Sequence, residues 1–358
     1  MSRPLRILQL VGSPTNAFFR DLSELYARGC IDALTDPERY AFVIAHVSPD
    51  GSWRFPETLT AAALAAAPAR TFAEAMRAID GLAIDAAVPQ MFCVPGMTDM
   101  RALLDVLGIP YLGNRPLQMA IAADKAKTRA LVAAAGVDVP RAQIVRGGAL
   151  PAIAFPAVVK PNDADNSDGV SLVTTERECA DAVRAALAFS ESVLVEDYVP
   201  LGREVRCGVV ERRGELVCLP LEEYFVDPHT RPIRRRVDKV RGDGGASLTL
   251  AAKTRSESWI VAPDDAIVPA VWAAARRCHV ALGCRQYSLF DFRLDPDGRP
   301  WFLEAGLYCS FSPQSVIVTM MEAAGVPLRR FFAESIGDVA GPVAVQREMT
   351  RVATEFGE

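Results

Sequence analysis

The N-terminal third of the chain alternates short apolar runs with longer amphipathic segments. The runs Leu5–Val11, Tyr40–Val47 and Ile84–Val88 predict buried strands, and the segment Phe18–Leu34 predicts a helix. Strands that alternate with helices are typical of a parallel α/β unit. We therefore predict that residues 1–115 form a small doubly wound N-terminal domain.

The pattern changes after residue 116. Residues 117–136 predict one long helix, which Gly136 ends. Closely spaced apolar runs then predict the strands Val158–Pro161, Ser171–Val173, Val193–Glu196, Glu204–Val210, Leu216–Leu221, Ser288–Asp295 and Arg299–Ala305. The segments Glu178–Phe189, Asp264–Leu282, Ser315–Gly325 and Leu328–Ile336 predict helices. We divide this part into a central subdomain at residues 116–200, a C-terminal subdomain at 201–340 and a tail at 341–358.

Composition narrows the class of protein. A chain of 358 residues suits two or three domains. Its net charge of -5 argues against nucleic acid as a partner, and no segment has the ~20 apolar residues of a membrane helix. Eight cysteines without a CxxC pair or a histidine cluster argue against zinc and favour the reducing cytoplasm.

Two lysines lie at positions where a bound anion would explain their charge. Lys160 lies inside an apolar strand, where a charge is costly to bury unless an anion pairs with it. The small-residue loop Asn166–Ser171 follows and offers backbone N–H groups. Lys125 lies in the long predicted helix and is flexible enough to reach a phosphate. The alternatives are a solvated helix lysine and an ordinary connecting turn.

Acidic residues supply a second kind of signal. The strand Val193–Val199 precedes Glu204, whose carboxylate can accept hydrogen bonds from two hydroxyl groups. Asp291 and Glu304 lie on the two strands of a hairpin that turns at Asp297-Gly298, so both can point to one face. Because Mg²⁺ is held by one or two carboxylates plus phosphate oxygens and water, this pair predicts a magnesium site.

A long polar segment, residues 227–258, lies between these signals. Six cations fall within eleven of its residues, namely Arg231, Arg234, Arg235, Arg236, Lys239 and Arg241. Loops of this length inside a compact domain are often lids over a site. The alternative is a solvated run of charges.

Taken in order over residues 84–330, these segments resemble the ATP-grasp superfamily and, within it, the D-alanine–D-alanine ligase branch. The resemblance implies an ATP-grasp fold of the α/β and α+β classes, with an N-terminal parallel α/β domain, a central small domain and a C-terminal catalytic domain. It also implies an ADP-forming carbon–nitrogen ligase that uses ATP and Mg²⁺. Its partners would be small carboxylate and amine substrates, and a homodimer stays open because the family is often dimeric.

The resemblance assigns roles residue by residue. ATP would be bound by Lys125, Lys160, Ser167, Glu196, Tyr198, Val199 and Glu204. The metal ligands would be Asp291 and Glu304. Lys239 would approach the γ-phosphate from the mobile loop, and Ser315 would contact the substrate carboxylate.

Two positions depart from the family pattern. The second metal-binding strand usually reads E-x-N, whereas here Gly306 replaces the amide residue. The ligases also carry an oxyanion-stabilising arginine two residues before the metal-binding aspartate, where this chain has Leu289. Our hypothesis from the sequence is that Arg293, on the same face of the strand as Asp291, replaces it.

Three functions fit these features. The first is a ligase that forms an amide or peptide bond between amino-acid-like substrates through an acyl phosphate. The second is a D-alanine–D-alanine ligase proper, against which Leu289 and Gly306 count. The third is a nucleotide-binding protein without ligase chemistry, although buried charges such as Lys160 and Glu204 argue for catalysis.

Overall fold

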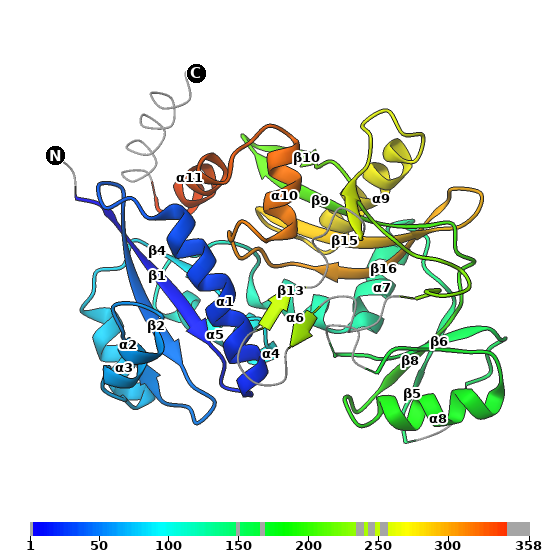
Figure 1. The fold of residues 1–358 in the computed structure, drawn as a ribbon, viewed down its shortest axis with the longest axis horizontal. Helices are drawn as coiled ribbons and strands as arrows, with labels where there is room; N and C mark the ends of the chain where they lie inside the picture. Colours follow the sequence, from blue (N-terminus) through cyan, green and yellow to red (C-terminus); the bar gives the residue numbers. More distant parts are fainter. Residues whose placement is uncertain are drawn as a thin grey trace. The chain divides into compact units, whose positions relative to one another are not determined.

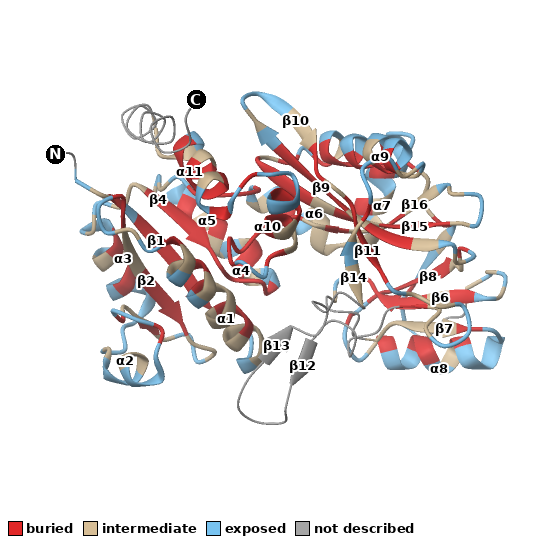
Figure 2. Ribbon diagram, turned by 45° about the horizontal axis from the view of Figure 1, so that its top comes forward, coloured by how far each residue is buried: buried red, intermediate tan, exposed pale blue. Residues whose placement is uncertain are grey.

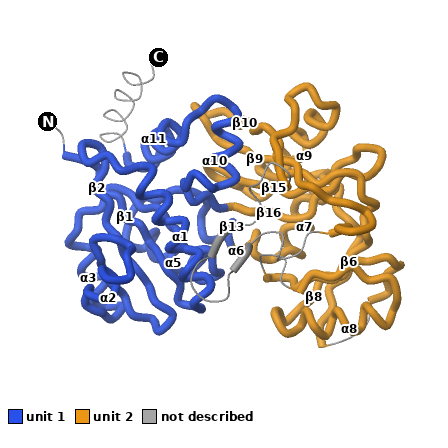
Figure 3. The backbone as a smooth tube through the Cα atoms, viewed as in Figure 1, with its two compact units in different colours: residues 1–119, 308–358 blue, residues 120–307 orange. Residues whose placement is uncertain are grey.

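The computed structural model describes residues 3–147, 151–164, 169–233, 240–242, 248–250 and 257–341 (Figure 1). Residue contacts divide the chain into two compact units, residues 1–119 with 308–358 and residues 120–307 (Figure 3). The predicted boundaries at 115, 200 and 340 draw a finer division, which stays a prediction.

The first unit contains a four-stranded sheet in the order β3-β2-β1-β4. Its strands are β1 (Leu5–Gly12), β2 (Tyr40–Val47), β3 (Trp53–Arg54) and β4 (Ala86–Pro89). β1 pairs in parallel with β2 and β4, as the alternating pattern predicts. Gly12 has φ +99, and a Cβ there would lie 2.0 Å from the carbonyl oxygen of Val47, so only glycine fits this turn.

Helices complete the first unit. They are α1 (Ala17–Leu34), α2 (Ala61–Ala66), α3 (Phe72–Asp80), α4 (Val94–Met97), α5 (Asp99–Val106), α10 (Val316–Ala323) and α11 (Leu328–Val339). α1 begins at Asn16, whose side-chain oxygen accepts a hydrogen bond from the backbone N–H of Phe19. A further helix, α6 (Pro116–Ala123), crosses the boundary into the second unit.

The smaller sheet of the second unit is antiparallel, with the order β5-β8-β6-β7. Its strands are β5 (Ala142–Val145), β6 (Ala157–Pro161), β7 (Ser171–Val173) and β8 (Val193–Asp197). Helix α8 (Glu176–Ala186) covers one face of this sheet (Figure 2). Its buried Val183 belongs to the same apolar cluster as Val159 and Val195 of the sheet. Since side chains alternate along a strand, Lys160 and Glu196 must point from the opposite face.

The larger sheet of the second unit has the order β14-β11-β9-β15-β16, with β10 paired to β9. Its strands are β9 (Arg203–Arg212), β10 (Glu215–Cys218), β11 (Glu222–Tyr224), β14 (Ser258–Ile260), β15 (Tyr287–Leu294) and β16 (Pro300–Gly306). Helix α9 (Val268–Ala281) packs on β9 and β15. Val205, Cys207, Phe290 and Phe292 are fully buried, and the alternate residues of the same strands form a polar face.

The predicted long helix at 117–136 is wrong at one residue, because α6 ends before Asp124 and α7 (Lys125–Ala134) starts after it. Asp124 has an extended backbone, and its carboxylate accepts a hydrogen bond from the N–H of Lys127. Aspartate is a favoured N-cap because it satisfies such an N–H group. Lys125 is therefore the first residue of a helix and not an interior one.

The predicted loop at 227–258 contains some regular structure. β12 (Val240–Gly242) pairs with β13 (Leu248–Leu250), and β14 begins at Ser258. Lys239 and the cluster Arg234–Arg236 lie outside the described residues. Among the helices that the structure describes, none has the length and apolar character needed to cross a membrane. All eight cysteines are buried and free of disulfide bonds.

His279 is a buried polar residue of the larger sheet's core. Its Nδ1 lies 2.8 Å from the hydroxyl of Ser288, and its Nε2 lies 3.6 Å from a carboxylate oxygen of Glu211. Burial lowers the pKa of His279, and the nearby charge of Glu211 offsets this only in part. The folded protein therefore holds this imidazole neutral at pH values where the unfolded chain takes up a proton.

We predict that this histidine makes the protein less stable in mild acid. As the pH falls below 6.5, the ordinary pKa of histidine, the unfolded state binds the extra proton and the free energy of unfolding declines, by at most about 1.4 kcal/mol per pH unit. His279→Gln should flatten the dependence between pH 7 and pH 5 in urea unfolding experiments. His229→Gln, at an exposed position, is the control, and an equal slope in both variants would contradict the assignment.

Candidate active site

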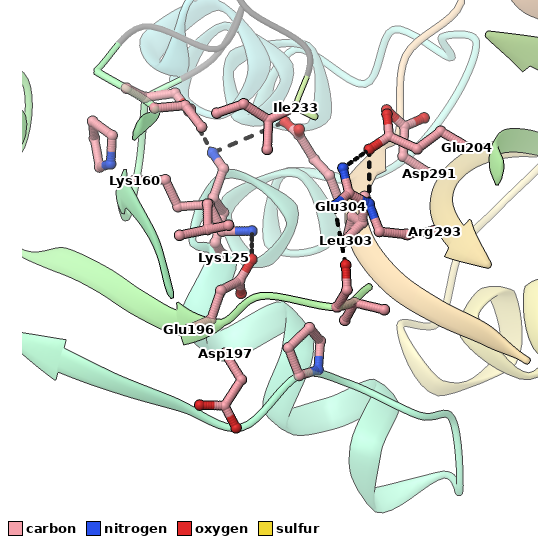
Figure 4. Close-up of a pocket in the computed structure, with 16 residues that line it drawn as sticks. Lys125, Lys160, Glu196, Asp197, Glu204, Ile233, Asp291, Arg293, Leu303 and Glu304 are labelled. Carbon is pink, nitrogen blue, oxygen red and sulfur yellow. Dashed lines mark hydrogen bonds and ion pairs between the residues drawn. The ribbon is translucent and has the colours of Figure 1, made fainter. Parts of the chain in front are cut away.

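A cavity in the second unit collects most of the predicted site residues (Figure 4). Its empty volume is about 790 Å³, which includes space open to solvent. The charged residues that line it are Lys125, Lys160, Glu196, Asp197, Glu204, Asp291, Arg293 and Glu304. Apolar side chains, among them Val158, Val199, Ile233 and Leu303, line the same space. The cavity thus combines apolar walls with converging charges.

The smaller sheet contributes a buried ion pair, Lys160 with Glu196. The ammonium nitrogen lies 2.6 Å from a carboxylate oxygen, and the two residues are only 7% and 4% exposed. Lys160 faces Leu194 across the ladder and Glu196 faces Val158, so the two side chains are diagonal neighbours on one face. Each charge compensates the other where water is excluded.

Lys125 is held at the start of α7 by the residue that follows β6. The side-chain oxygen of Asn162 accepts a hydrogen bond from the N–H of Ala126, and its backbone oxygen accepts one from the N–H of Lys125. The ammonium group of Lys125 donates to the carbonyl of Ala164 and lies 3.9 Å from a carboxylate oxygen of Glu304. The position therefore brings a cation to the end of the cavity that holds Glu304.

Glu204 and Arg293 form a second buried pair on the larger sheet. They face each other across β9 and β15, and Arg293 donates to Glu204 from both Nε and Nη2. The same guanidinium donates to the carbonyl oxygens of Val199 and Pro232 and lies over the ring of Tyr198, 5.1 Å from its centroid. These contacts fix the direction in which Glu204 presents its carboxylate.

Asp291 and Glu304 face each other across β15 and β16. Beyond them the ladder shifts by one residue, because Leu303 is extra on β16. Asp291 also accepts a hydrogen bond of 2.6 Å from Nε of Arg206, its partner on β9. Burial lowers the pKa of the Arg206 guanidinium, but Asp291, Tyr224 and Glu222 together outweigh this effect, so the pKa lies above its ordinary value.

The acidic side chains of the cavity fit the metal that the sequence predicts. No group of three or more His, Cys, Asp or Glu side chains in the described parts of the chain is arranged to hold a metal on its own. The facing pair Asp291 and Glu304 nevertheless fits Mg²⁺, because this ion needs only one or two carboxylates when phosphate oxygens complete its shell. The two carboxylates therefore suit a metal ion that binds together with a phosphate group.

Four predicted residues are not among those that line this cavity. Tyr198 is one of them, and its ring lies against the guanidinium of Arg293. Ser315 belongs to the first unit, where its hydroxyl lies 3.5 Å from the sulfur of Cys309. Ser167 and Lys239 lie outside the described residues. The roles predicted for these residues, like those predicted for the residues that line the cavity, stay predictions.

Sequence reasoning missed two residues of this region, Asn162 and Arg206. Asn162 had no signal of its own, because its role depends on a helix start that the sequence pattern concealed. Arg206 had a weak signal, since it lies two residues after Glu204 and must share its face of β9.

The fold and the charged cavity are those of a nucleotide-dependent ligase, and comparisons with known proteins identify the family. The family described as D-ala D-ala ligase C-terminus matches residues 142–336. A D-alanine–D-alanine ligase of Mycolicibacterium gilvum is 30% identical over 348 residues, which cover 85% of this chain and 90% of that protein. Another from Gloeobacter violaceus is 30% identical, covering 66% and 76% of the two chains.

A solved structure supports the same fold. The VanG D-Ala:D-Ser ligase of Enterococcus faecalis superposes with a TM-score of 0.73 at 20% identity, covering 94% of this chain and 99% of that one. The chain therefore belongs to the D-alanine–D-alanine ligase family, and its fold is the ATP-grasp fold. It is an ATP-dependent, ADP-forming carbon–nitrogen ligase, as members of this family are.

The buried lysine gives a prediction that separates stability from binding. Lys160→Met leaves Glu196 buried without its cation, which costs about 3–5 kcal/mol of stability. Lys160→Met with Glu196→Gln removes both charges and should restore most of this loss. If Lys160 binds nucleotide, the double variant should still bind a fluorescent ATP analogue far more weakly than the wild type.

Thermal unfolding and analogue titration are measured on the same samples. Lys127→Met, at an exposed position of the same α7 helix that carries Lys125, is the control and should change neither quantity. Recovery of both stability and nucleotide affinity in the double variant would show that Lys160 only pairs with Glu196 and does not bind nucleotide.

Proposed function

We propose that the protein joins a carboxylate to an amine on amino-acid-like substrates, through an acyl phosphate made from ATP. The observation that carries the proposal is the cavity itself. Two cations, Lys125 and Lys160, share it with the facing carboxylates Asp291 and Glu304 and with the buried Glu204. This is the combination that a nucleoside triphosphate and a divalent cation require.

In this proposal the nucleotide lies along the cavity. Adenine contacts the end of β8 at Glu196, Tyr198 and Val199, where the apolar wall of the cavity, which includes Val158 and Val199, can pack against a flat base. Glu204 accepts hydrogen bonds from the ribose hydroxyls, and Arg293 keeps its carboxylate in place. Lys160, Lys125 and the loop that contains Ser167 then spread the negative charge of the phosphates.

Asp291 and Glu304 would hold Mg²⁺ when it is bound with the nucleotide. The ion would supply positive charge to the phosphate oxygens, which the lysines also contact. Because Gly306 has no side-chain oxygen, the protein contributes one ligand fewer than the E-x-N pattern. We propose that a water takes this place, or that a second ion binds weakly.

The chemistry proceeds in two displacements. A carboxylate oxygen of the acid substrate attacks the γ-phosphorus, and ADP leaves with the electrons of the broken P–O bond. The amine then attacks the acyl carbon, loses a proton and expels inorganic phosphate, so an amide forms. The protein positions and neutralises charge, with Lys239 and Ser315 as predicted contacts to the γ-phosphate and the substrate carboxylate.

The identity of the substrates is a separate question. Leu289 and Gly306 lie opposite each other on β15 and β16, so both departures from the family pattern meet at one place. We therefore favour amino-acid-like substrates other than the D-alanine pair, and a D-alanine–D-alanine ligase proper is the alternative.

The test is the release of ADP from Mg-ATP in the presence of a pool of L- and D-amino acids. We expect release that requires two components of the pool, that falls by orders of magnitude in Lys160→Met/Glu196→Gln, and that is retained in Lys127→Met. Omission of each amino acid in turn names the acid and the amine, and mass spectrometry identifies the amide product.

Three results are informative. Release with D-alanine alone would select the alternative substrate. Release without any amide product would contradict the proposed acyl transfer. Excess EDTA should stop release and added Mn²⁺ should restore it, and release that is indifferent to EDTA would contradict the proposed metal site.

A further inference from the structure

The cavity face of the larger sheet is organised in three successive rows of facing residues. Because residues two apart on a strand share a face, the ladder registers place every row on the same side of the sheet. The first row is Tyr224, Glu204 and Arg293. The second is Glu222, Arg206, Asp291 and Glu304. The third is Gly208, Leu289 and Gly306.

The third row has no charged side chain. It is also where the family pattern would place an oxyanion-stabilising arginine, at Leu289. In the proposed function the ribose lies over the first row at Glu204 and the phosphates over the second, so we place the reacting acyl group beside the third. The developing negative charge of the tetrahedral intermediate therefore needs a cation from elsewhere.

Arg293 is badly placed to supply it. Arg293 lies in the first row, and its guanidinium donates to Glu204 and to the carbonyls of Val199 and Pro232. Moving it toward the third row would leave Glu204 buried without its partner. The geometry therefore argues against the replacement that the sequence suggested.

Arg206 is the single cation of the second and third rows. It faces Asp291 directly, with a hydrogen bond of 2.6 Å, and its guanidinium carbon lies 4.8 Å from the centre of the Tyr224 ring. Leu289 is its diagonal neighbour on β15, at a separation that a long side chain spans, about 7–8 Å. Gly208, the member of the third row next to Arg206 on β9, has no side chain to block the way.

We propose that Arg206 is the catalytic cation that stabilises the oxyanion during acyl transfer. It takes the role that the family pattern gives to an arginine at the position of Leu289, on the neighbouring strand. This inference rests on the proposed function. Asp291 and the ring of Tyr224 hold the guanidinium from two sides, so its direction is fixed before the substrate binds. The cation that stabilises the oxyanion therefore lies on β9 and not on β15.

The first experiment measures steady-state kinetics and nucleotide affinity for Arg206→Met and Arg206→Lys. Loss of one oxyanion donor should lower kcat by about 10²–10³, while the KM for ATP and the affinity for a fluorescent ATP analogue stay near those of the wild type. Arg206→Lys keeps a charge and should retain part of the rate.

The decisive variant moves the positive charge from β9 to β15, the strand on which the family pattern places it. In Arg206→Met with Leu289→Arg, the new side chain lies opposite Gly208 and Gly306, which have no side chains, and a Cβ built at Gly306 meets no atom within 4 Å. We expect kcat to recover by at least tenfold over Arg206→Met. A residue that acted only through its ion pair with Asp291 would show no such rescue.

Arg203→Met is the matched control. Arg203 lies on the same strand but pairs with Glu223 and Asp265, so its loss should leave kcat unchanged. Arg293→Met should instead weaken nucleotide binding, because Glu204 loses its partner. Normal kcat in Arg206→Met, or a failure of Leu289→Arg to restore it, overturns the assignment of Arg206 alone. No amino-acid-dependent release by the wild type overturns the proposed function and this inference with it.

Discussion

The second unit depends on keeping its buried and half-buried charges in pairs. Lys160 with Glu196, Arg293 with Glu204 and Arg206 with Asp291 are each held across neighbouring strands, and a lone charge at any of these places would cost several kcal/mol. Such pairs add little net stability compared with apolar residues of the same size. Their retention is therefore better explained by a charged ligand, to which a preorganised set of charges presents little reorganisation cost.

In each sheet of the second unit, the helix that covers one face decides which face is polar. α8 and α9 bury one face of each sheet with apolar side chains, so the polar residues of every strand are directed to the other face. Strand alternation then turns a linear sequence into rows, and the ladder registers decide which side chains meet. A shift of one residue would send Glu204, Arg206 and Asp291 into the core. The apolar packing against the helices is thus what fixes the chemistry on the other side.

Much of this could be read from the sequence, and the limits have physical causes. Lys160 and the pair Asp291 and Glu304 could be predicted because a charge inside an apolar strand, or on a hairpin, has few alternative explanations. The break at Asp124 was missed because the apolar spacing runs through it, and only the backbone of the cap shows that the helix restarts. Arg206 was passed over because its partners Asp291 and Glu222 lie 85 and 16 positions away in the chain, and the pairing of β9 with β15 and β11 is needed to bring them together.

The same reasoning explains why a family motif can lose a residue without losing its chemistry. An oxyanion is stabilised by a cation at the right point in space, and a sheet offers that point to side chains from two neighbouring strands. Leu289 and Gly306 leave a row without charge or bulk, and that row lies next to Arg206. A substrate with an apolar group beside its carboxylate could lie on this row, where an arginine and an asparagine would otherwise project. The two departures from the family pattern are therefore one local change, in which the cation moves to β9 and the vacated space becomes available to the substrate.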